Sequence, residues 1–253
     1  CEAHGISKES LFSNEFVREY AFTNERKMMG HVWRKGGRLV VAAKGSPERI
    51  LTLCSLTAKA RCAVEEQMQA LSSQGLRVIA IAAAHPENEA AIPAAITDCR
   101  LTLLGLVGLA DPPRESVKND IAVCNRAGIR VVMITGDNGI TASAIAQKIG
   151  VPGSDNIITG EALEAMSDEE LRVAVKTASI FSRVIPAHKM RIVKAFQENG
   201  AIVAMTGDGV NDVLALKEAD CSIAMAEGSD AAKNIANVVL LDSNFGAMPH
   251  IVN

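Results

Sequence analysis

The amino-acid sequence predicts an α/β protein in two parts, an antiparallel sheet with helices followed by a Rossmann-like parallel sheet with helices. Up to about residue 109, alternating and apolar runs are separated by short turns, as in antiparallel strands. Beyond that point helical and strand patterns alternate, which is typical of a parallel sheet. Between the two parts, Asp111-Pro112-Pro113 interrupts regular structure. We therefore expect one domain at residues 1–109 and a second at residues 110–253.

The first part begins with a half-buried strand, because apolar and charged residues alternate from Phe16 to Phe22. The hairpin turn Lys35-Gly36-Gly37 joins two further strands. Ser46 suits the N-cap of a short helix that begins at Pro47. The elements expected here are strands at 16–22, 28–33, 39–43, 76–84 and 101–109, and a helix at 58–74 that ends at Gly75.

The second part alternates strands and helices. Ser167 and Glu170 form a predicted capping box, and the apolar run from Ala201 to Ala204 has the pattern of a buried parallel strand. The expected helices are 113–127, 140–149, 168–177, 187–199, 212–218 and 229–235, and the expected strands are 129–134, 156–158, 179–182, 201–205, 221–225 and 237–241.

Composition excludes several classes of protein. Hydrophobic residues make up 48% of the 253 residues but aromatics only 3%, so the cores must be built from Ala, Val, Ile and Leu. A net charge of −3 gives no electrostatic case for nucleic acid as a partner. The six scattered cysteines include no Cys-x-x-Cys pair, which favours reduced thiols over a metal or disulfide framework. No apolar run reaches the roughly 20 residues that a membrane span needs, so we expect no membrane insertion by this chain.

Two strand ends carry the residues on which a functional prediction depends. After the apolar run at 201–204 comes Thr206-Gly207-Asp208-Gly209-Val210-Asn211-Asp212, and the strand expected at 129–134 leads into Thr135-Gly136-Asp137. The glycines permit sharp turns, and the aspartates supply hard oxygen ligands that suit Mg²⁺. Ligands of open α/β sheets bind beyond the carboxyl ends of the strands. The pattern therefore predicts a site for Mg²⁺ and phosphate.

The stretch from Thr206 to Lys217, TGDGVNDVLALK, resembles the hinge motif of P-type cation-transporting ATPases, usually written TGDGVNDAPALK. Four more stretches agree with that family in the same order: Lys44-Gly45-Ser46-Pro47-Glu48, Asp111-Pro112-Pro113-Arg114, Met133-Ile134-Thr135-Gly136-Asp137, and Arg183-Val184-Ile185-Pro186-Ala187-His188-Lys189. Val213-Leu214 stands where the family has Ala-Pro, and Ser46 where alanine is commoner. The resemblance covers nearly the whole chain and implies ATP as substrate, Mg²⁺ as cofactor and a haloacid dehalogenase-type (HAD-type) second domain.

The resemblance also implies roles for individual residues. Asp208 is the expected Mg²⁺ ligand, assisted by Asp212, and Lys189 is expected to contact the transferred phosphate. The expected catalytic set is Thr135, Gly136, Asp137, Lys189, Asn211 and Asp212. The expected nucleotide-binding set is Phe22, Arg26, Lys44, Gly45, Arg77, Asp111, Arg114 and Arg183. Within it, Phe22 would stack on adenine and Arg77 would reach the phosphates, while Asp111 and Arg114 would lie at a hinge between the domains.

Neither the DKTGT string of the family's nucleophilic aspartate nor the TGES actuator string occurs in this sequence. In the family the nucleophile strand lies between the strands that end here at Thr135 and Thr206. We therefore expect a second domain with two exposed strand edges and a chain that forms no phosphoenzyme by itself.

The leading hypothesis is the ATP-binding and partial phosphorylation region of an ATP-driven pump for calcium or another non-soft-metal cation. It would lie at the cytoplasmic face of a membrane, with the pump's actuator and transmembrane domains as partners. One alternative is a module that binds ATP without catalysis. The other is a soluble phosphatase of the haloacid dehalogenase type, a class that needs an Asp-x-Asp strand which this sequence lacks. A P-loop mechanism is excluded because no Gly-x-x-x-x-Gly-Lys-Ser/Thr loop occurs.

Overall fold

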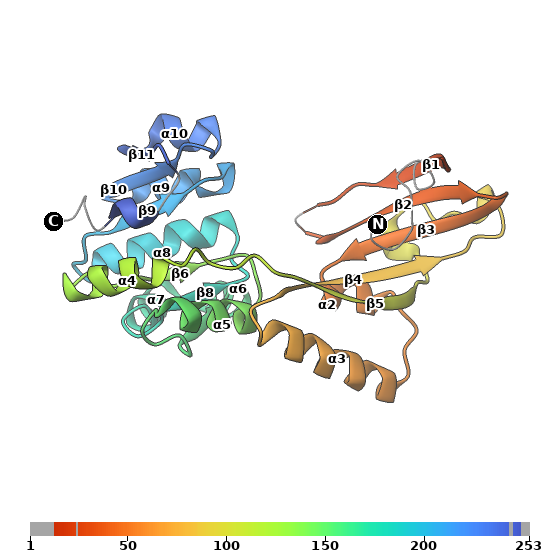
Figure 1. The fold of residues 1–253 in the computed structure, drawn as a ribbon, viewed down its shortest axis with the longest axis horizontal. Helices are drawn as coiled ribbons and strands as arrows, with labels where there is room; N and C mark the ends of the chain where they lie inside the picture. Colours follow the sequence, from red (N-terminus) through yellow and green to blue (C-terminus); the bar gives the residue numbers. More distant parts are fainter. Residues whose placement is uncertain (1–12, 24, 243–244, 249–253) are drawn as a thin grey trace. The chain divides into compact units, whose positions relative to one another are not determined.

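The computed structural model describes residues 13–23, 25–242 and 245–248 and shows two compact units (Figure 1). The first unit runs to Ala110 without residues 73–75, and the second contains residues 73–75 and the chain from Asp111 onward. None of the helices among the described residues combines the length and the apolar character that crossing a membrane requires.

A five-stranded antiparallel sheet forms the centre of the first unit, as the sequence predicts. Its strands follow the chain order: β1 (Glu15–Tyr20), β2 (Met28–Lys35), β3 (Arg38–Gly45), β4 (Arg77–Ala84) and β5 (Thr102–Leu109). The expected hairpin joins β2 to β3, and it needs its two glycines because Gly36 and Gly37 have positive φ angles of 54° and 76°.

The core of the first unit lies under one face of this sheet. Helices α2 (Pro47–Thr52) and α3 (Ala58–Ser72) pack against β4, and Ile50 of α2 is fully buried with Val32 and Val41. Two short 3₁₀ helices follow β4, at Glu89–Ala91 and Ile96–Asp98. Buried positions are filled mainly by Val, Ile, Leu and Ala, which agrees with the low aromatic content. No disulfide joins the cysteines that the structure describes, and three of them are buried.

The second unit is built from alternating strands and helices, with parallel strand pairs. Its helices are α4 (Val117–Arg126), α5 (Gly139–Ile149), α6 (Gly160–Ala165), α7 (Asp168–Ala174), α8 (Pro186–Glu198), α9 (Val213–Glu218) and α10 (Asp230–Ile235). Its strands are β6 (Met133–Ile134), β7 (Ile157–Thr159), β8 (Ile180–Ser182), β9 (Ala204–Gly207), β10 (Cys221–Met225) and β11 (Val238–Leu240). The predicted capping box of Ser167 and Glu170 is present at the start of α7.

The described strands of the second unit form two three-stranded sheets, in the orders β6-β8-β7 and β11-β10-β9. Strands β6 and β9 are therefore both edge strands, as expected for a domain without its nucleophile strand. Two expectations were wrong in detail. The strand expected at 129–134 pairs only at 133–134, and the run expected as the buried strand 201–205 is largely exposed, with Ile202 90% accessible. Residues 201–203 precede β9, which begins at Ala204 and has a strand neighbour on one side only, so this run lies at an open edge of its sheet.

Helix α8 connects the two sheets. Its Ile192 and Ala195 pack with Phe181 of β8, while its Val193 packs with Met205 of β9. Ile134 of β6 borders both hydrophobic clusters. Helix α8 is thus the element that fixes the ends of β6 and β9 within one unit.

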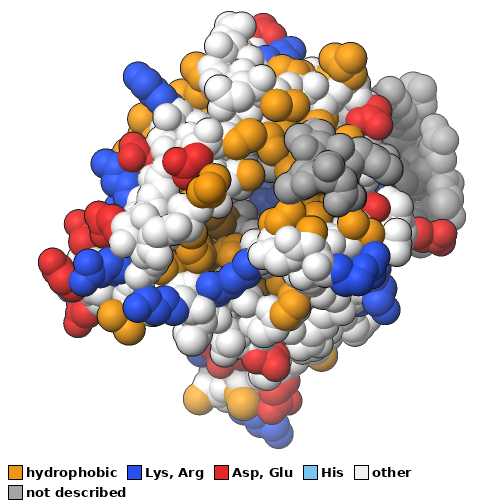
Figure 2. Space-filling view, turned by 90° about the vertical axis from the view of Figure 1, so that its left-hand side faces the viewer, with side chains coloured by type: hydrophobic (Ala, Val, Ile, Leu, Met, Phe, Trp, Pro, Cys, Tyr) orange, Lys and Arg blue, Asp and Glu red, His pale blue; other side chains and the backbone are white. Residues whose placement is uncertain are grey.

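Figure 2 shows one face of the molecule, on which hydrophobic side chains gather around a hollow.

Candidate functional site

The Thr-Gly-Asp loop after β9 is closed by Asp212. The Nζ atom of Lys189, in the first turn of α8, lies 2.5 Å from Oδ1 of Asp212, and these side chains are only 18% and 7% exposed. The other carboxylate oxygen, Oδ2, accepts hydrogen bonds from the backbone N–H groups of Gly209 (3.1 Å) and Asp208 (3.3 Å). Both oxygens of Asp212 are therefore engaged, and the carboxylate ties Lys189 to the loop.

The glycines of this loop are required by close contacts. A Cβ atom on Gly207 would stand 2.5 Å from Cβ of Asp212, and one on Gly228 would stand 2.7 Å from the carbonyl oxygen of Asp208. That carbonyl also accepts a hydrogen bond of 2.7 Å from the N–H of Ser229. The backbone of Asp208 is therefore held firmly, although Asp208 itself is exposed.

Asp208 is the residue of this loop best suited to a divalent cation, because its exposed carboxylate follows directly on the end of β9. Among the described residues, no group of three or more His, Cys, Asp or Glu side chains is placed to hold a metal ion. The residues present therefore fit Mg²⁺ only in part, and the role of Asp208 as a ligand stays a prediction. The part of Asp212 in metal binding stays a prediction.

The start of β9 is fixed by a second aspartate. Oδ2 of Asp220 accepts hydrogen bonds from the N–H of Val203 (2.8 Å) and from Nε2 of Gln197 on α8 (3.2 Å). These bonds hold the pKa of the Asp220 carboxyl below its usual range, with the Val203 N–H as the larger cause. The sequence motifs did not single out Asp220, although it lies directly before β10.

The second Thr-Gly-Asp loop, after β6, is joined to the segment between β8 and α8. The Thr135 hydroxyl accepts a hydrogen bond of 3.1 Å from the Asp137 N–H, and the Thr135 carbonyl accepts one of 3.2 Å from Val184. The Asp137 carbonyl accepts a bond of 3.0 Å from the N–H of Arg183. Gly136, at the tip, is exposed. The loop therefore lies against the segment that leads to Lys189.

Arg183 has an unusual backbone conformation at this corner. Its φ angle is +54°, in the left-handed region that non-glycine residues rarely adopt. Gly160, the first residue of α6, lies against the Arg183 carbonyl oxygen so closely that a Cβ atom there would overlap it. Non-glycine residues held in this region are enriched at functional sites. Arg183 thus lies beside the Thr-Gly-Asp loop of the second unit, whereas most of the expected nucleotide residues belong to the first unit.

The first unit gathers five of the expected nucleotide-binding residues at one end of its sheet. Because adjacent strands are antiparallel, the end of β1, the start of β2, the end of β3 and the start of β4 share that end. Phe22 follows β1 and is 54% exposed, and the exposed Arg26 lies in the turn before β2. Lys44 and Gly45 end β3 and Arg77 begins β4. An exposed aromatic ring and several cations at one sheet end can accommodate a nucleotide.

Lys27 was missed by the sequence reasoning and lies at the same end. Its carbonyl accepts a hydrogen bond of 2.9 Å from the N–H of Ser46, and its φ angle is +52°. Gly45 packs so tightly on Met28 that a Cβ atom there would overlap the Met28 side chain. The register of β2 and β3, which pairs Met28 with Gly45, is the signal that could have placed Lys27 beside Ser46, just after the end of β3.

The three expected residues that remain are all exposed. Asp111 and Arg114 are exposed in the stretch between β5 and α4, and Asn211 is exposed in the 3₁₀ turn Val210–Asp212.

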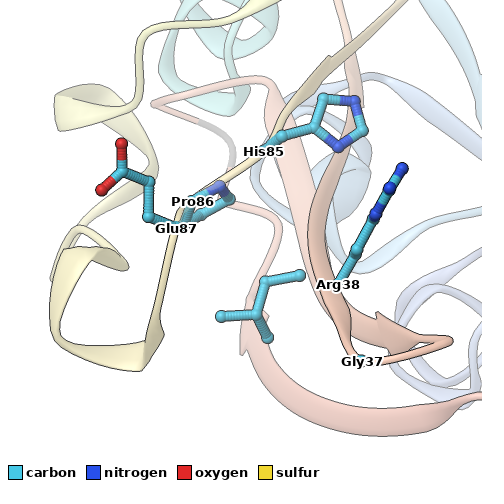
Figure 3. A pocket seen from close by; sticks show the side chains of 6 residues that line it. Gly37, Arg38, His85, Pro86 and Glu87 are labelled. Atoms are coloured by element: carbon cyan, nitrogen blue, oxygen red, sulfur yellow. The ribbon is translucent and has the colours of Figure 1, made fainter.

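A pocket of about 400 Å³ lies at the other end of the first sheet, at the β2–β3 turn and after β4. It is lined by Gly37, Arg38, Leu39, His85, Pro86 and Glu87, and its Arg38 and His85 lie together while Glu87 points away (Figure 3). The sequence reasoning assigned no role to this pocket.

Comparison with known proteins shows which protein families the chain is similar to. Residues 4–116 match the model of the P-type ATPase cytoplasmic domain N, and residues 188–251 match that of haloacid dehalogenase-like hydrolases. The chain is 40% identical over 259 residues to a calcium-transporting ATPase of Bacillus subtilis, covering 96% of this chain and 29% of that protein.

Two fungal proteins are about as similar. The endoplasmic reticulum calcium ATPase srcA of Aspergillus fumigatus is 40% identical over 254 residues, covering 90% of this chain and 26% of that protein. The sodium/potassium exporting P-type ATPase cta3 of Schizosaccharomyces pombe is 39% identical over 267 residues, covering 97% of this chain and 26% of that protein. The chain therefore spans less than a third of the length of these relatives.

Proposed function

We propose that this chain, which belongs to the family of P-type cation-transporting ATPases, forms the ATP-binding region and part of the phosphorylation region of an ATP-driven cation pump. The observation that carries the proposal is the contact between Lys189 and Asp212, directly beside Asp208 at the carboxyl end of β9. It combines a fixed cation, backbone N–H groups and an exposed carboxylate at a parallel sheet edge, as phosphoryl transfer requires.

The second unit supplies charge and positioning for a phosphoryl group. The Lys189 ammonium, held by Asp212, offsets negative charge on the phosphate oxygens. The Thr135 hydroxyl and the exposed Gly136 N–H offer two hydrogen-bond donors at the neighbouring loop. Asn211 orients water or phosphate oxygens. Mg²⁺, held by Asp208 and by ligands beyond this chain, would neutralise further charge on the phosphate.

The first unit binds the nucleotide at the sheet end described above. The Phe22 ring stacks on the base, which is worth about 1–3 kcal/mol where such stacking has been measured for single strands. Lys44, Arg26 and Arg77 then supply the positive charge that the triphosphate needs. In this proposal Arg183 also contacts the nucleotide phosphates, and the stretch with Asp111 and Arg114 is the hinge.

The proposed cargo is calcium or another hard cation. Two of the three relatives named above are called calcium ATPases and the third a sodium/potassium exporter, which supports a cation without choosing one. The proposed partners are the actuator and transmembrane domains of the same pump, and the proposed place is the cytoplasmic face of its membrane.

Whether the chain has a nucleophilic carboxylate distinguishes this proposal from a phosphatase. The sequence has no DKTGT aspartate, so incubation with γ-labelled ATP and Mg²⁺ should leave bound ATP but no acid-stable, hydroxylamine-sensitive label on the chain. The chain should also fail to hydrolyse p-nitrophenyl phosphate. Hydrolysis that is lost in Asp208→Asn would instead support a free-standing phosphatase, and stoichiometric label would show that another carboxylate serves as nucleophile.

A further inference from the structure

We propose that His188 and Glu164 are positioning residues for Lys189: the hydrogen bond between them fixes the first turn of α8 and so places the Lys189 ammonium against Asp212. The proposal deepens the function given above, because it rests on Lys189 as the partner of the phosphate. It begins from the fact that His188 immediately precedes Lys189 and is itself buried, with 5% of its surface exposed.

The start of α8 lacks an ordinary cap. Its N-cap residue is Ile185, whose side chain has no hydrogen-bond acceptor, and Pro186 follows at the first helical position. His188 takes over the capping role, since its Nδ1 atom accepts a hydrogen bond of 3.4 Å from the Ile185 N–H. The first N–H groups of a helix have no partner inside it, so this bond holds a turn that would otherwise fray.

Glu164 of α6 holds the other side of the His188 ring. Its Oε2 atom lies 2.7 Å from Nε2 of His188. Because Nδ1 accepts a bond from the Ile185 N–H, Nε2 is the ring nitrogen that donates to Glu164. The same bond holds the pKa of the Glu164 carboxyl below its usual range. Gly160 at the start of α6 packs on the ring as well, with its ideal Cβ position 3.4 Å from Nδ1.

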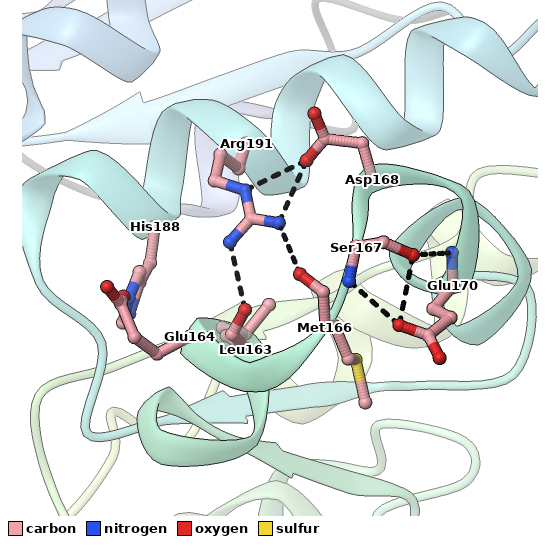
Figure 4. Close-up of polar contacts among 8 residues, drawn as sticks. All are labelled: Leu163, Glu164, Met166, Ser167, Asp168, Glu170, His188 and Arg191. Atoms are coloured by element: carbon pink, nitrogen blue, oxygen red, sulfur yellow. Dashed lines mark hydrogen bonds and ion pairs between the residues drawn. The ribbon is translucent and has the colours of Figure 1, made fainter.

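The rest of α8 is held in place by separate contacts of Arg191. Arg191 donates hydrogen bonds of 2.9 Å to the carbonyls of Leu163 and Met166 and contacts Asp168 at 2.8 and 3.1 Å (Figure 4). The helix therefore keeps its place through Arg191 even when the His188 contact is lost. What His188 and Glu164 add is local: they order the one turn that carries Lys189.

The placement of Lys189 depends on that turn because a lysine side chain has many rotamers and its ammonium follows the position of its Cα atom. When the turn is ordered, the ammonium is paired with Asp212 and mostly covered. When the turn opens, the same ammonium becomes accessible to solvent while lysines farther along α8 do not change. Lys194, on the same helix and 49% exposed, is the internal reference.

The test measures the accessibility of lysine amines by limited acetylation of the whole chain with an N-hydroxysuccinimide ester, followed by mass spectrometry. We expect Glu164→Ala and His188→Ala to raise the ratio of Lys189 to Lys194 labelling by at least about threefold, as local opening of a helix end does. Glu164→Gln should keep the parent ratio, since its amide oxygen still accepts from Nε2 of His188. Glu161→Ala, a change of an exposed carboxylate on the same short helix, is the matched control.

An unchanged ratio in Glu164→Ala would overturn the proposal, and so would an equal increase in Glu164→Gln or in Glu161→Ala. Should His188→Ala fail to fold, Glu164→Ala decides alone, because Glu164 is exposed and its removal leaves the Arg191 contacts intact. The labelling needs neither ATP nor Mg²⁺. A failure of ATP or phosphate binding would therefore count against the proposed function and leave the positioning of Lys189 standing.

Discussion

Replacing Lys189 with methionine tests the ion pair at the centre of the second unit. Methionine keeps most of the length of the side chain but removes its charge, and it leaves the Asp212 carboxylate 7% exposed with only two backbone N–H partners. A hydrogen bond to a charged group contributes about 1.5–3 kcal/mol, and breaking a buried pair costs about 3–5 kcal/mol. For this partly covered pair we expect a loss of about 2 kcal/mol.

The aromatic residues make the assay specific for one unit. The only tryptophan and the only tyrosine, Trp33 and Tyr20, both lie in the first unit, so fluorescence follows that unit alone. Circular dichroism follows both units. A loss of about 2 kcal/mol lowers the melting temperature of a domain of this size by about 6–8 °C. We therefore expect a shift of that size in the dichroism transition of Lys189→Met and no shift in the fluorescence transition.

Lys194→Met is the matched control, because Lys194 is on the same helix and its pairing with Glu218 at 3.8 Å is more exposed, with side chains 49% and 33% accessible. Exposed pairs contribute at most about 1 kcal/mol, so its shift should be small. The double variant Lys189→Met with Asp212→Asn should lose less stability than the two single variants added together, since neither charged group of the pair remains without its partner. Equal shifts in Lys189→Met and Lys194→Met, or strict additivity in the double variant, would refute the reasoning.

Three further outcomes are expected. Calorimetric titration with ATP should show binding weakened at least about fivefold in Phe22→Ala, with a smaller loss in Lys44→Ala, because stacking on the base contributes about 1–3 kcal/mol; unchanged affinity in both variants would count against the pocket. High Mg²⁺ should raise the melting temperature of the parent clearly more than that of Asp208→Asn, and equal gains would place the ion elsewhere. Asp220 and Glu164 have pKa values below the usual range in the folded chain, because of their bonds to Val203 N–H and to His188. Their stabilising contribution is present above the ordinary carboxyl pKa of about 4 and is lost as the pH falls through the lowered values. The stability difference between the parent and Asp220→Asn should therefore shrink below about pH 4, and a constant difference down to about pH 2 would contradict the assignment.

Features set by neighbouring residues were predictable from the sequence. The turn at Gly36-Gly37 follows from the need for positive φ angles, and the capping box of Ser167 and Glu170 follows from a spacing of three residues. Both depend on contacts within a few positions. The residue patterns of the two Thr-Gly-Asp loops belong to the same class, because glycine and aspartate are what such turns require.

Features that depend on distant partners were not predictable in the same way. The run at 201–205 was expected to be buried, but Ile202 is 90% exposed and lies before β9, which begins at Ala204 at the edge of its sheet. The pairing of Asp212 with Lys189 joins residues on different elements, so the motif alone suggested a metal ligand. His188, Glu164 and Lys27 were missed because their contacts arise only when α6 meets α8 and when β2 pairs with β3.

Mapping ATP on the chain by ¹H–¹⁵N NMR titration tests most directly whether this is the nucleotide-binding region of a pump. The predicted result is that the largest shift changes fall at the sheet end with Phe22, Lys44 and Arg77, and that they are strongly reduced in Phe22→Ala. Shift changes concentrated instead at the opposite end, around Arg38 and His85 in the 400 Å³ pocket, would contradict it, and so would no change at millimolar ATP.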